Sequence, residues 1–208
     1  MIGVAAIGEF FAAYLEAIEE AQASLDRLDA VAGDGDHGAT MLMGMREVVA
    51  AQTGAQGTPA QALRVAGEAF GSVGGSIGPL WGTALVRAAR VADERPSIDG
   101  PVAAEMLTAA VAGLRDRGRS ELGDKTLLDV MEPATHVFAE AVEGGLAAEA
   151  ALQRGVEAAQ LALAGTAGLA ARRGRARRLA ARSVGSVDPG AASACLAWET
   201  AATLRSHM

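Results

Sequence analysis

The amino-acid sequence predicts an all-α protein. Alanine and leucine dominate the composition, half of the 208 residues are hydrophobic, and only 3% are aromatic. Alanine and leucine favour helices, whereas the β-branched and aromatic residues that favour strands are thinly spread. Apolar residues also recur every three or four positions in one segment after another, which is the period of an amphipathic helix. No long linker or low-complexity tract divides the chain, so we expect a single domain over residues 1–208.

The periodic segments predict about eight helices. The first carries its apolar face at Val4, Ile7, Phe11, Tyr14, Leu15 and Ile18. The others are expected at residues 38–54, 59–72, 77–93, 100–116, 125–144, 147–171 and 189–206. Pro59 and Pro189 suit a first helical turn, and Gly144-Gly145 suits a helix end. Short connections between consecutive helices favour antiparallel neighbours.

The composition excludes several classes of protein. A formal net charge of -7 argues against a nucleic-acid partner, because phosphate backbones would be repelled overall. The single cysteine, Cys195, excludes an internal disulfide framework and a multi-cysteine zinc site, and its apolar neighbours predict a buried helical thiol. The longest apolar stretch, near 155–171, contains Glu157 and glycines, so it falls short of a membrane span. No secretory signal pattern is visible, and we expect a cytoplasmic protein without a membrane partner.

Three aspartates gather in a glycine-broken turn at residues 29–38. Asp29, Asp34 and Asp36 repel one another unless a positive charge lies among them. Mg²⁺ takes oxygen ligands and is commonly held by a few carboxylates together with substrate phosphates. An EF-hand is excluded, because neither Asp29 nor Asp34 begins a loop with an acidic residue at its twelfth position. A metal-bound phosphate site is the favoured interpretation, and a solvated turn of helix-capping aspartates is the alternative.

Two further segments combine glycine with residues that can hold anions. Residues 71–83 form a small-residue turn leading into a helix, which suits either a phosphate or close helix packing. This turn is not a dinucleotide-binding fingerprint, because no strand precedes it. Residues 123–126 read Gly-Asp-Lys-Thr, but Asp124 separates the glycine from the lysine and the upstream glycine of a P-loop is missing. The alternative role for Asp124 is a helix N-cap.

The last segment is a run of arginines between residues 172 and 182, followed by Asp188-Pro189-Gly190. Such a run is most often a solvated face, and nucleic-acid binding is the usual functional guess. The acidic balance of the chain and the scarcity of stacking aromatics disfavour nucleic acid. Because a guanidinium matches phosphate oxygens in a fork geometry, one or two of these arginines holding a diphosphate is the favoured interpretation.

With these four segments in this order, the chain resembles the L subunit of dihydroxyacetone kinase, the nucleotide-binding half of a two-part kinase. The likeness spans nearly the whole chain, and the order of the four motifs makes it specific. The motifs that carry it are Leu28 to Gly38, Gly74 to Thr83, Gly123 to Thr126, and Gly174-Arg175-Ala176 with Arg182-Ser183 and Asp188-Pro189-Gly190.

The resemblance implies an eight-helix antiparallel barrel with the nucleotide site at one mouth. It implies that Asp29, Asp34 and Asp36 hold two Mg²⁺ ions that bridge to the diphosphate of ADP or ATP. The residues that it implies around the nucleotide are His37, Gly38, Ala39, Thr40, Ser76, Ile77, Gly123, Glu132, Arg175, Asp188, Pro189 and Gly190. No side chain of this subunit is expected to act as a catalytic nucleophile.

At three of these positions the residue differs from the one usual in the family. Thr40 stands where asparagine is usual, Ile77 where serine is usual, and Glu132 where an apolar residue is common. Because Ile77 has no hydroxyl group, its contact with phosphate is expected to pass to Ser76 or to backbone amides.

The resemblance also implies partners. A stand-alone L-type chain is most similar to the phosphotransferase-dependent, phosphoenolpyruvate-driven branch. There, tightly bound ADP is phosphorylated in place by a phosphohistidine protein, the M subunit, and the phosphate passes to dihydroxyacetone on the K subunit. One alternative is an ATP-dependent kinase subunit for a related ketose such as erythrulose. The other is a nucleotide-loaded regulatory module that binds a transcription factor.

Overall fold

The computed structural model describes residues 1–52, 57–93 and 95–205, and these residues form helices joined by loops. The ends of two expected helices, at 53–54 and 206, lie outside the described residues. The helices are α1 (Val4–Ala30), α2 (His37–Gln52), α3 (Pro59–Gly71), α4 (Ile77–Val91), α5 (Gly100–Gly118), α6 (Leu128–Glu143), α7 (Ala148–Gly165), η1 (Thr166–Gly168), η2 (Arg175–Leu179), α8 (Ala180–Ser183) and α9 (Pro189–Arg205). An isolated bridge pairs Ile2 with Ile98, and the described residues form no longer strand pairing.

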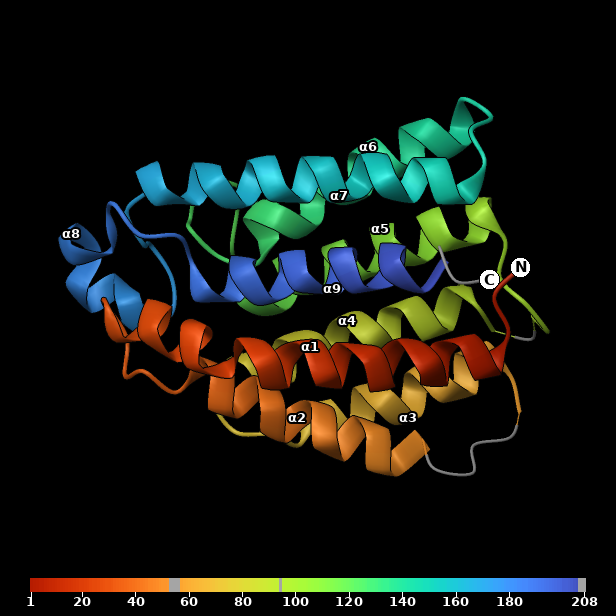
Figure 1. The fold of residues 1–208 in the computed structure, drawn as a ribbon, viewed down its shortest axis with the longest axis horizontal. Helices are drawn as coiled ribbons and strands as arrows, with labels where there is room; N and C mark the ends of the chain where they lie inside the picture. Colours follow the sequence, from red (N-terminus) through yellow and green to blue (C-terminus); the bar gives the residue numbers. More distant parts are fainter. Residues whose placement is uncertain (53–56, 94, 206–208) are drawn as a thin grey trace.

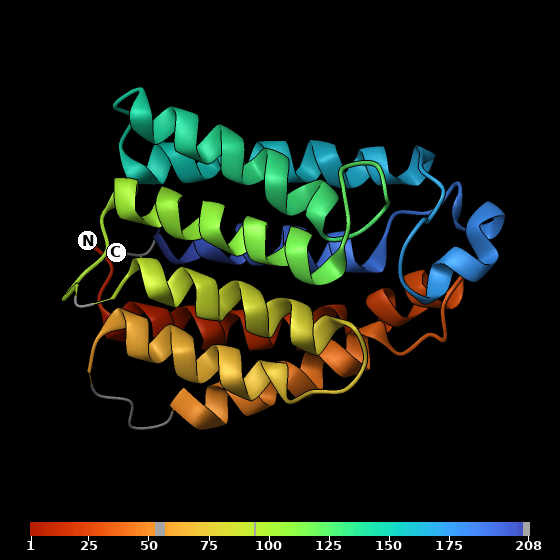
Figure 2. The ribbon, with the colours of Figure 1, turned by 180° about the vertical axis from the view of Figure 1, so that it is seen from behind.

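Eight long helices close into an antiparallel ring in the described part of the chain. Each helix from α1 to α7 packs against the next, and α9 packs between α7 and α1. Figure 1 shows the helices running along one long axis, and Figure 2 shows α3, α4 and α5 side by side on the opposite face. The short helix α8 lies outside the ring, at one end of it (Figure 1). The expected eight-helix antiparallel barrel is therefore confirmed.

The apolar faces of the ring helices meet in one core. Each ring helix contributes buried side chains, among them Ile18, Met45, Phe70, Trp81, Leu114, Leu128, Val156 and Trp198. Cys195 is also buried, which confirms the expected helical thiol, and burial raises its pKa to about 12. The Tyr14 hydroxyl is buried as well and donates to the Ser193 carbonyl at 2.8 Å, tying α1 to α9. A buried polar group without such a partner would cost about 1–3 kcal/mol.

Helix starts follow the capping chemistry visible in the sequence. Thr58 precedes Pro59 and makes a capping box with Gln61. Asp99 accepts the backbone N–H of Val102 at 2.9 Å and begins α5. These local hydrogen bonds explain why the predicted starts of α3 and α5 agree with the structure.

Two predicted boundaries are wrong. The helix expected at 125–144 begins three residues later, because Lys125 has a left-handed backbone (φ 60°) that interrupts a helix. Asp124 is not its N-cap. The loop amides of Thr126 and Gly123 instead donate to Asp129 inside the helix.

The helix expected at 147–171 ends at Gly165. After η1, Leu169 has an extended backbone, and the chain leaves the ring before returning at α9. Residues 172–188 were expected to lie between helices, but periodicity extended the preceding helix over residues 166–171, because these alanine-rich residues continue the helical pattern of α7.

The antiparallel ring gathers the starts of α2, α4, α6 and α9 at one end of the molecule (Figure 1). The N-terminus of a helix carries unpaired N–H groups and a partial positive charge, so this end favours anions. The loops after α1, α3, α5 and α7 cover the same end. None of the described helices is both long and apolar enough to cross a lipid bilayer.

Candidate functional site

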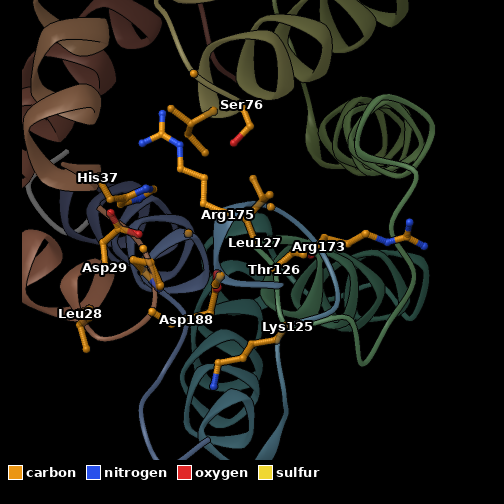
Figure 3. Close-up of a pocket in the computed structure, with 18 of the residues that line it drawn as sticks. Leu28, Asp29, His37, Ser76, Lys125, Thr126, Leu127, Arg173, Arg175 and Asp188 are labelled. Carbon is orange, nitrogen blue, oxygen red and sulfur yellow. The ribbon is translucent and has the colours of Figure 1, made fainter. Parts of the chain in front are cut away.

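A cavity of about 460 Å³ opens at the end of the ring where these helices begin. Its wall comes from all four loops that cover this end, and from the starts of α2, α4 and α9. The volume lies within the range of about 300–1,000 Å³ that is usual for sites that bind small molecules and cofactors. Figure 3 shows Asp29 and His37 on one side of this pocket and Ser76 on another, with Arg175 between them.

The acidic loop brings three carboxylates together at the pocket wall. Asp29 lies in the last turn of α1, and Asp34 and Asp36 follow in the loop. One oxygen atom from each carboxylate lies within 4.8 Å of the other two. Asp29 Oδ2 accepts the backbone N–H groups of Gly35 at 2.8 Å and Asp36 at 3.1 Å, which folds the loop back onto α1. Gly35 has a positive φ of 76°, a conformation that glycine adopts without steric cost.

These carboxylates fit a hard divalent cation. Three oxygen ligands from one loop, with solvent or phosphate oxygens for the remaining positions, are the coordination that Mg²⁺ prefers. The charge also fits, because three neighbouring carboxylates need positive charge among them. Among the His, Cys, Asp and Glu side chains of the described residues, these three aspartates form the group that lies close enough together to hold a metal ion.

Arg175 provides a positive charge beside these carboxylates. It begins η2 and follows Gly174, whose positive φ of 63° turns the chain. Its guanidinium forms an ion pair with Asp34 and a second with Asp36 at 3.3 Å. The arginine therefore joins the excursion after α7 to the acidic loop after α1.

His37 begins α2 and faces the cavity. Its Nε2 lies 3.0 Å from the Ser193 hydroxyl oxygen on α9. Burial lowers the pKa of His37, and the nearby carboxylates of Asp29 and Asp26 oppose this effect. Burial thus favours the neutral imidazole, which can donate or accept a hydrogen bond with Ser193 or with a ligand.

The start of α4 presents backbone N–H groups to the pocket. Ser76 and Ile77 line the cavity together with Gly75. The N-cap residue of this helix is Ser76, and within the described residues its side chain makes no capping hydrogen bond. By contrast, Asp188 caps α9 by accepting the Ala191 N–H at 2.8 Å. The start of α4 is thus suited to a bound anion, with Ile77 contributing its backbone.

Asp188 combines its capping role with a place on the pocket wall, next to Pro189 and Gly190. Desolvation by the surrounding protein raises its pKa to about 7, and Asp129 adds to this shift while the Ala191 N–H and Lys125 oppose it. The folded protein therefore binds this proton more tightly than the unfolded chain does.

Because the pKa of Asp188 is raised on folding, its proton stabilises the fold at low pH, and this stabilisation is lost as the pH rises through about 7. We expect the free energy of unfolding of Asp188→Asn to rise relative to wild type between pH 5 and 8, by about 2–3 kcal/mol. Asparagine keeps the cap and does not titrate. Urea titrations at four pH values measure the difference. Parallel stability curves for the two proteins would contradict the shifted pKa.

The structure gathers most of the expected site residues in this pocket. Its lining includes Asp29, Asp34, Asp36, His37, Thr40, Ser76, Ile77, Arg175, Asp188, Pro189 and Gly190. Gly38, Ala39, Gly123 and Glu132 do not line it. Glu132 instead pairs with Arg115 on α5, because its place in α6 turns it toward that helix.

Ala39, Gly123 and Gly38 make structural contacts beside the pocket. The Ala39 N–H donates to Asp26 at 3.1 Å, which caps α2, and the Gly123 N–H donates to Asp129. A Cβ atom on Gly38 would lie 2.3 Å from the carbonyl oxygen of Gln22. The absence of a side chain at Gly38 therefore lets α2 start directly against α1.

Gly38→Ala should lower the free energy of unfolding by about 2–4 kcal/mol, because backbone atoms must move to admit the new methyl group. Gly8→Ala is the matched control, since nothing lies within 4 Å of a Cβ there and alanine favours helix α1. Urea denaturation measures both variants. Equal stability of the Gly38 variant and wild type would contradict the close packing of α1 and α2.

Several pocket residues escaped the sequence analysis. Leu28, Leu80 and Leu127 provide apolar wall, and Arg117 lies at the end of α5. Single apolar residues on amphipathic helices carry no signal that separates pocket wall from core. Asp26, which caps α2 from α1, also went unnoticed, although it lies three residues before the acidic loop.

In the described residues, an antiparallel ring of eight helices carries clustered carboxylates, an arginine and the uncapped start of α4 at one mouth. This combination defines an all-α protein with a pocket suited to a metal-bound anion. The sequence matches the family of the DAK2 domain (Dak2) over residues 31–203. The chain belongs to the DAK2 domain family.

Similarity to individual relatives covers most of the chain. It is 36% identical over 185 residues to the "PEP-dependent dihydroxyacetone kinase 1, ADP-binding subunit DhaL" of Listeria innocua, covering 87% of this chain and 86% of the relative. It is 36% identical over 177 residues to the corresponding DhaL subunit of Escherichia coli, covering 81% of each. It is also 39% identical to the "L-erythrulose 1-kinase" of Mycolicibacterium smegmatis, covering 83% of this chain. The chain spans only 30% of that longer kinase.

Solved structures share the fold. The dihydroxyacetone kinase of C. freundii, determined in complex with AMP-PNP and Mg²⁺, superposes with a TM-score of 0.75 at 22% identity. The match covers 96% of this chain and 34% of that kinase. The native form of the same kinase gives a TM-score of 0.74.

Proposed function

We propose that residues 1–208 form the nucleotide-binding domain and phosphoryl-transfer subunit of a dihydroxyacetone kinase. The observation that carries the proposal is the meeting of three carboxylates, Arg175 and the start of α4 in one pocket. DhaL subunits that bear the name "ADP-binding subunit" support it, because this chain matches them over most of their length.

Asp29, Asp34 and Asp36 would hold two Mg²⁺ ions in this proposal. Two ions bring four positive charges and three carboxylates bring three negative charges, so the remaining positive charge attracts a diphosphate. Bound Mg²⁺ would supply charge neutralisation for the phosphates of ADP or ATP. The named Mg²⁺ complex of a protein with this fold supports the choice of metal.

The protein side chains bind and orient the nucleotide. Arg175 would donate to phosphate oxygens, and the N–H groups at the start of α4 would cradle them, with Ser76 adding a hydroxyl group. His37 and Thr40 lie at the same wall and would contact the nucleotide beside the metal. No covalent step on the protein is required, because phosphoryl transfer depends on positioning and charge neutralisation.

The acceptor would be dihydroxyacetone held by a separate K subunit, in the cytoplasm. The phosphoryl donor would be a phosphohistidine M subunit of a phosphoenolpyruvate-dependent system, which rephosphorylates ADP in place. The words "PEP-dependent" in the names of the DhaL relatives support this choice.

A second candidate is an ATP-dependent kinase that acts on erythrulose. Two erythrulose kinases of Mycolicibacterium smegmatis are 39% and 38% identical to this chain, although it spans only about a third of their length. The similarity of these two kinases to this chain is the observation that favours a related ketose as the acceptor in the second candidate.

Reconstitution tests both candidates. The chain is mixed with a K-type subunit and supplied either with the phosphohistidine donor or with ATP, and phosphorylation of dihydroxyacetone and erythrulose is followed. We expect phosphorylated dihydroxyacetone with the phosphohistidine donor. Turnover with ATP alone, on erythrulose, would favour the second candidate. No phosphorylated ketose in any mixture, together with tight binding to a transcription factor, would instead indicate a regulatory module.

A further inference from the structure

Lys125 is the single lysine of the chain, which also contains 17 arginines. It is also buried, with 4% of its surface exposed. A buried ammonium group requires compensation, because its desolvation is costly. Position 125 therefore differs from the arginine positions in carrying a compact ammonium group in place of a guanidinium group.

The Lys125 ammonium group lies in a cage of backbone carbonyls. Its Nζ donates to the carbonyl oxygens of Thr166 at 2.8 Å, Leu169 at 3.1 Å, Ser183 at 2.6 Å and Ser186 at 2.6 Å. All four acceptors belong to the excursion between α7 and α9, which we call the 166–188 segment. Figure 3 shows the Lys125 side chain pointing away from Ser76 and Arg175. Lys125 is also part of the pocket lining, but its ammonium group is directed to these carbonyls of the segment.

The 166–188 segment has almost no apolar core of its own. Its buried residues are Thr166, Ala171 and Ser183, and every residue from 172 to 175 is exposed. Hydrogen bonds must therefore determine its conformation. The Ser183 hydroxyl oxygen accepts the Ala171 N–H at 2.9 Å, and the Gly185 N–H donates to the Ala167 carbonyl at 2.8 Å.

The turn that carries Lys125 makes further links to the same segment. Asp124 accepts the Arg173 Nε–H at 2.8 Å, and its carbonyl accepts the Arg172 N–H at 3.0 Å. Lys125 has a left-handed backbone, and the neighbouring residues Asp124 and Lys125 bind different parts of the segment. Arg175, which pairs with Asp34 and Asp36, follows two residues after Arg173.

We propose that Lys125 is a positioning residue: its ammonium group organises the 166–188 segment and thereby places Arg175 at the carboxylate cluster. Lys125 contacts neither Arg175 nor the carboxylates, so it acts through the backbone that it binds. The effect on nucleotide binding rests on the proposed function, whereas the effect on the segment does not.

Hydrogen exchange on the full chain tests the structural part. In Lys125→Met, which keeps the length but removes the charge, we expect exchange of the Ala171, Arg172, Gly185 and Asp188 amides to accelerate about tenfold or more. Amides in α1 to α5 should keep their protection. Lys125→Arg should behave similarly, because a planar guanidinium cannot reproduce four converging bonds to one nitrogen. The matched control is Arg119→Met, an exposed cation in the same loop that also has a positive φ.

A double-mutant cycle tests the effect on Arg175. Lys125→Met should weaken Mg²⁺-ADP binding by about tenfold or more, and adding Arg175→Gln should cost little further. Additive losses would overturn the proposed action through Arg175. Unchanged exchange in the segment would overturn the proposal as a whole. Exchange is measured without nucleotide, so it decides the role of Lys125 even if Mg²⁺-ADP binding, and with it the proposed function, fails.

The wild-type protein provides a test that needs no folded variant. Because the chain has one lysine, an amine-acylating reagent gives a single side-chain adduct, at Lys125. We expect native Lys125 to react about 100-fold more slowly than N-acetyl-lysine amide, since opening of the segment must precede attack. Comparable reaction rates would overturn the carbonyl cage.

Discussion

Replacing Asp34 by asparagine should weaken the Mg²⁺-dependent binding of ADP by about 100-fold or more. The substitution removes one of three clustered carboxylates and leaves the size of the side chain almost unchanged. Calorimetric titration with ADP, in Mg²⁺ and separately in EDTA, isolates the part of the affinity that depends on metal. The loss should appear in Mg²⁺ and be small in EDTA. Kinase activity in the reconstituted complex should fall in parallel.

Asp93→Asn is the matched control for this variant. Asp93 is also an exposed carboxylate that pairs with an arginine, Arg64, but it follows α4 at the opposite end of the ring. Its replacement should leave ADP affinity within about twofold, because exposed ion pairs contribute little. Wild-type affinity and activity in Asp34→Asn would contradict the assignment of the metal site.

Arg175→Gln should weaken binding of Mg²⁺-ADP by about 10–100-fold, the range expected for a lost hydrogen-bonded charge pair with phosphate. Its affinity for Mg²⁺ without nucleotide should not fall, because the guanidinium of Arg175 competes with the cation for Asp34 and Asp36. Titration with Mg²⁺ alone, followed by ADP, separates these effects. Loss at both steps would show that Arg175 supports the acidic loop and does not bind phosphate.

Arg177→Gln is the control for charge. Arg177 lies in η2 with Arg175 and is exposed, but it does not line the pocket. Equal losses in the Arg175 and Arg177 variants would indicate a general attraction of anions to this arginine-rich segment. A loss confined to the Arg175 variant would indicate a direct contact.

Local patterns account for what the sequence revealed about the site. Asp29, Asp34 and Asp36 lie within eight residues, so one turn had to bring them together. The start of α4 was visible because glycine and serine precede an apolar helix. Antiparallel packing with short connections then explains why these separate segments meet at one end of the ring.

The remaining contacts could not be read from spacing. His37 meets Ser193 across 156 residues, and Lys125 reaches Ser186 across 61 residues. The end of α7 at Gly165 was missed because the alanine-rich residues 166–171 continue its pattern. Glu132 was expected near the nucleotide, but it pairs with Arg115 on α5, a contact between two helices that the spacing of residues along the chain does not reveal.

Native mass spectrometry of the purified protein tests the central claim most directly. If the acidic loop and Arg175 hold a metal-bound diphosphate, the protein should carry a mass increment of one ADP and two Mg²⁺, which EDTA removes from wild type. Asp34→Asn should lack the metal ions. A wild-type protein that carries neither nucleotide nor metal, and acquires neither when both are added in excess, would contradict the proposal that this pocket is a nucleotide site.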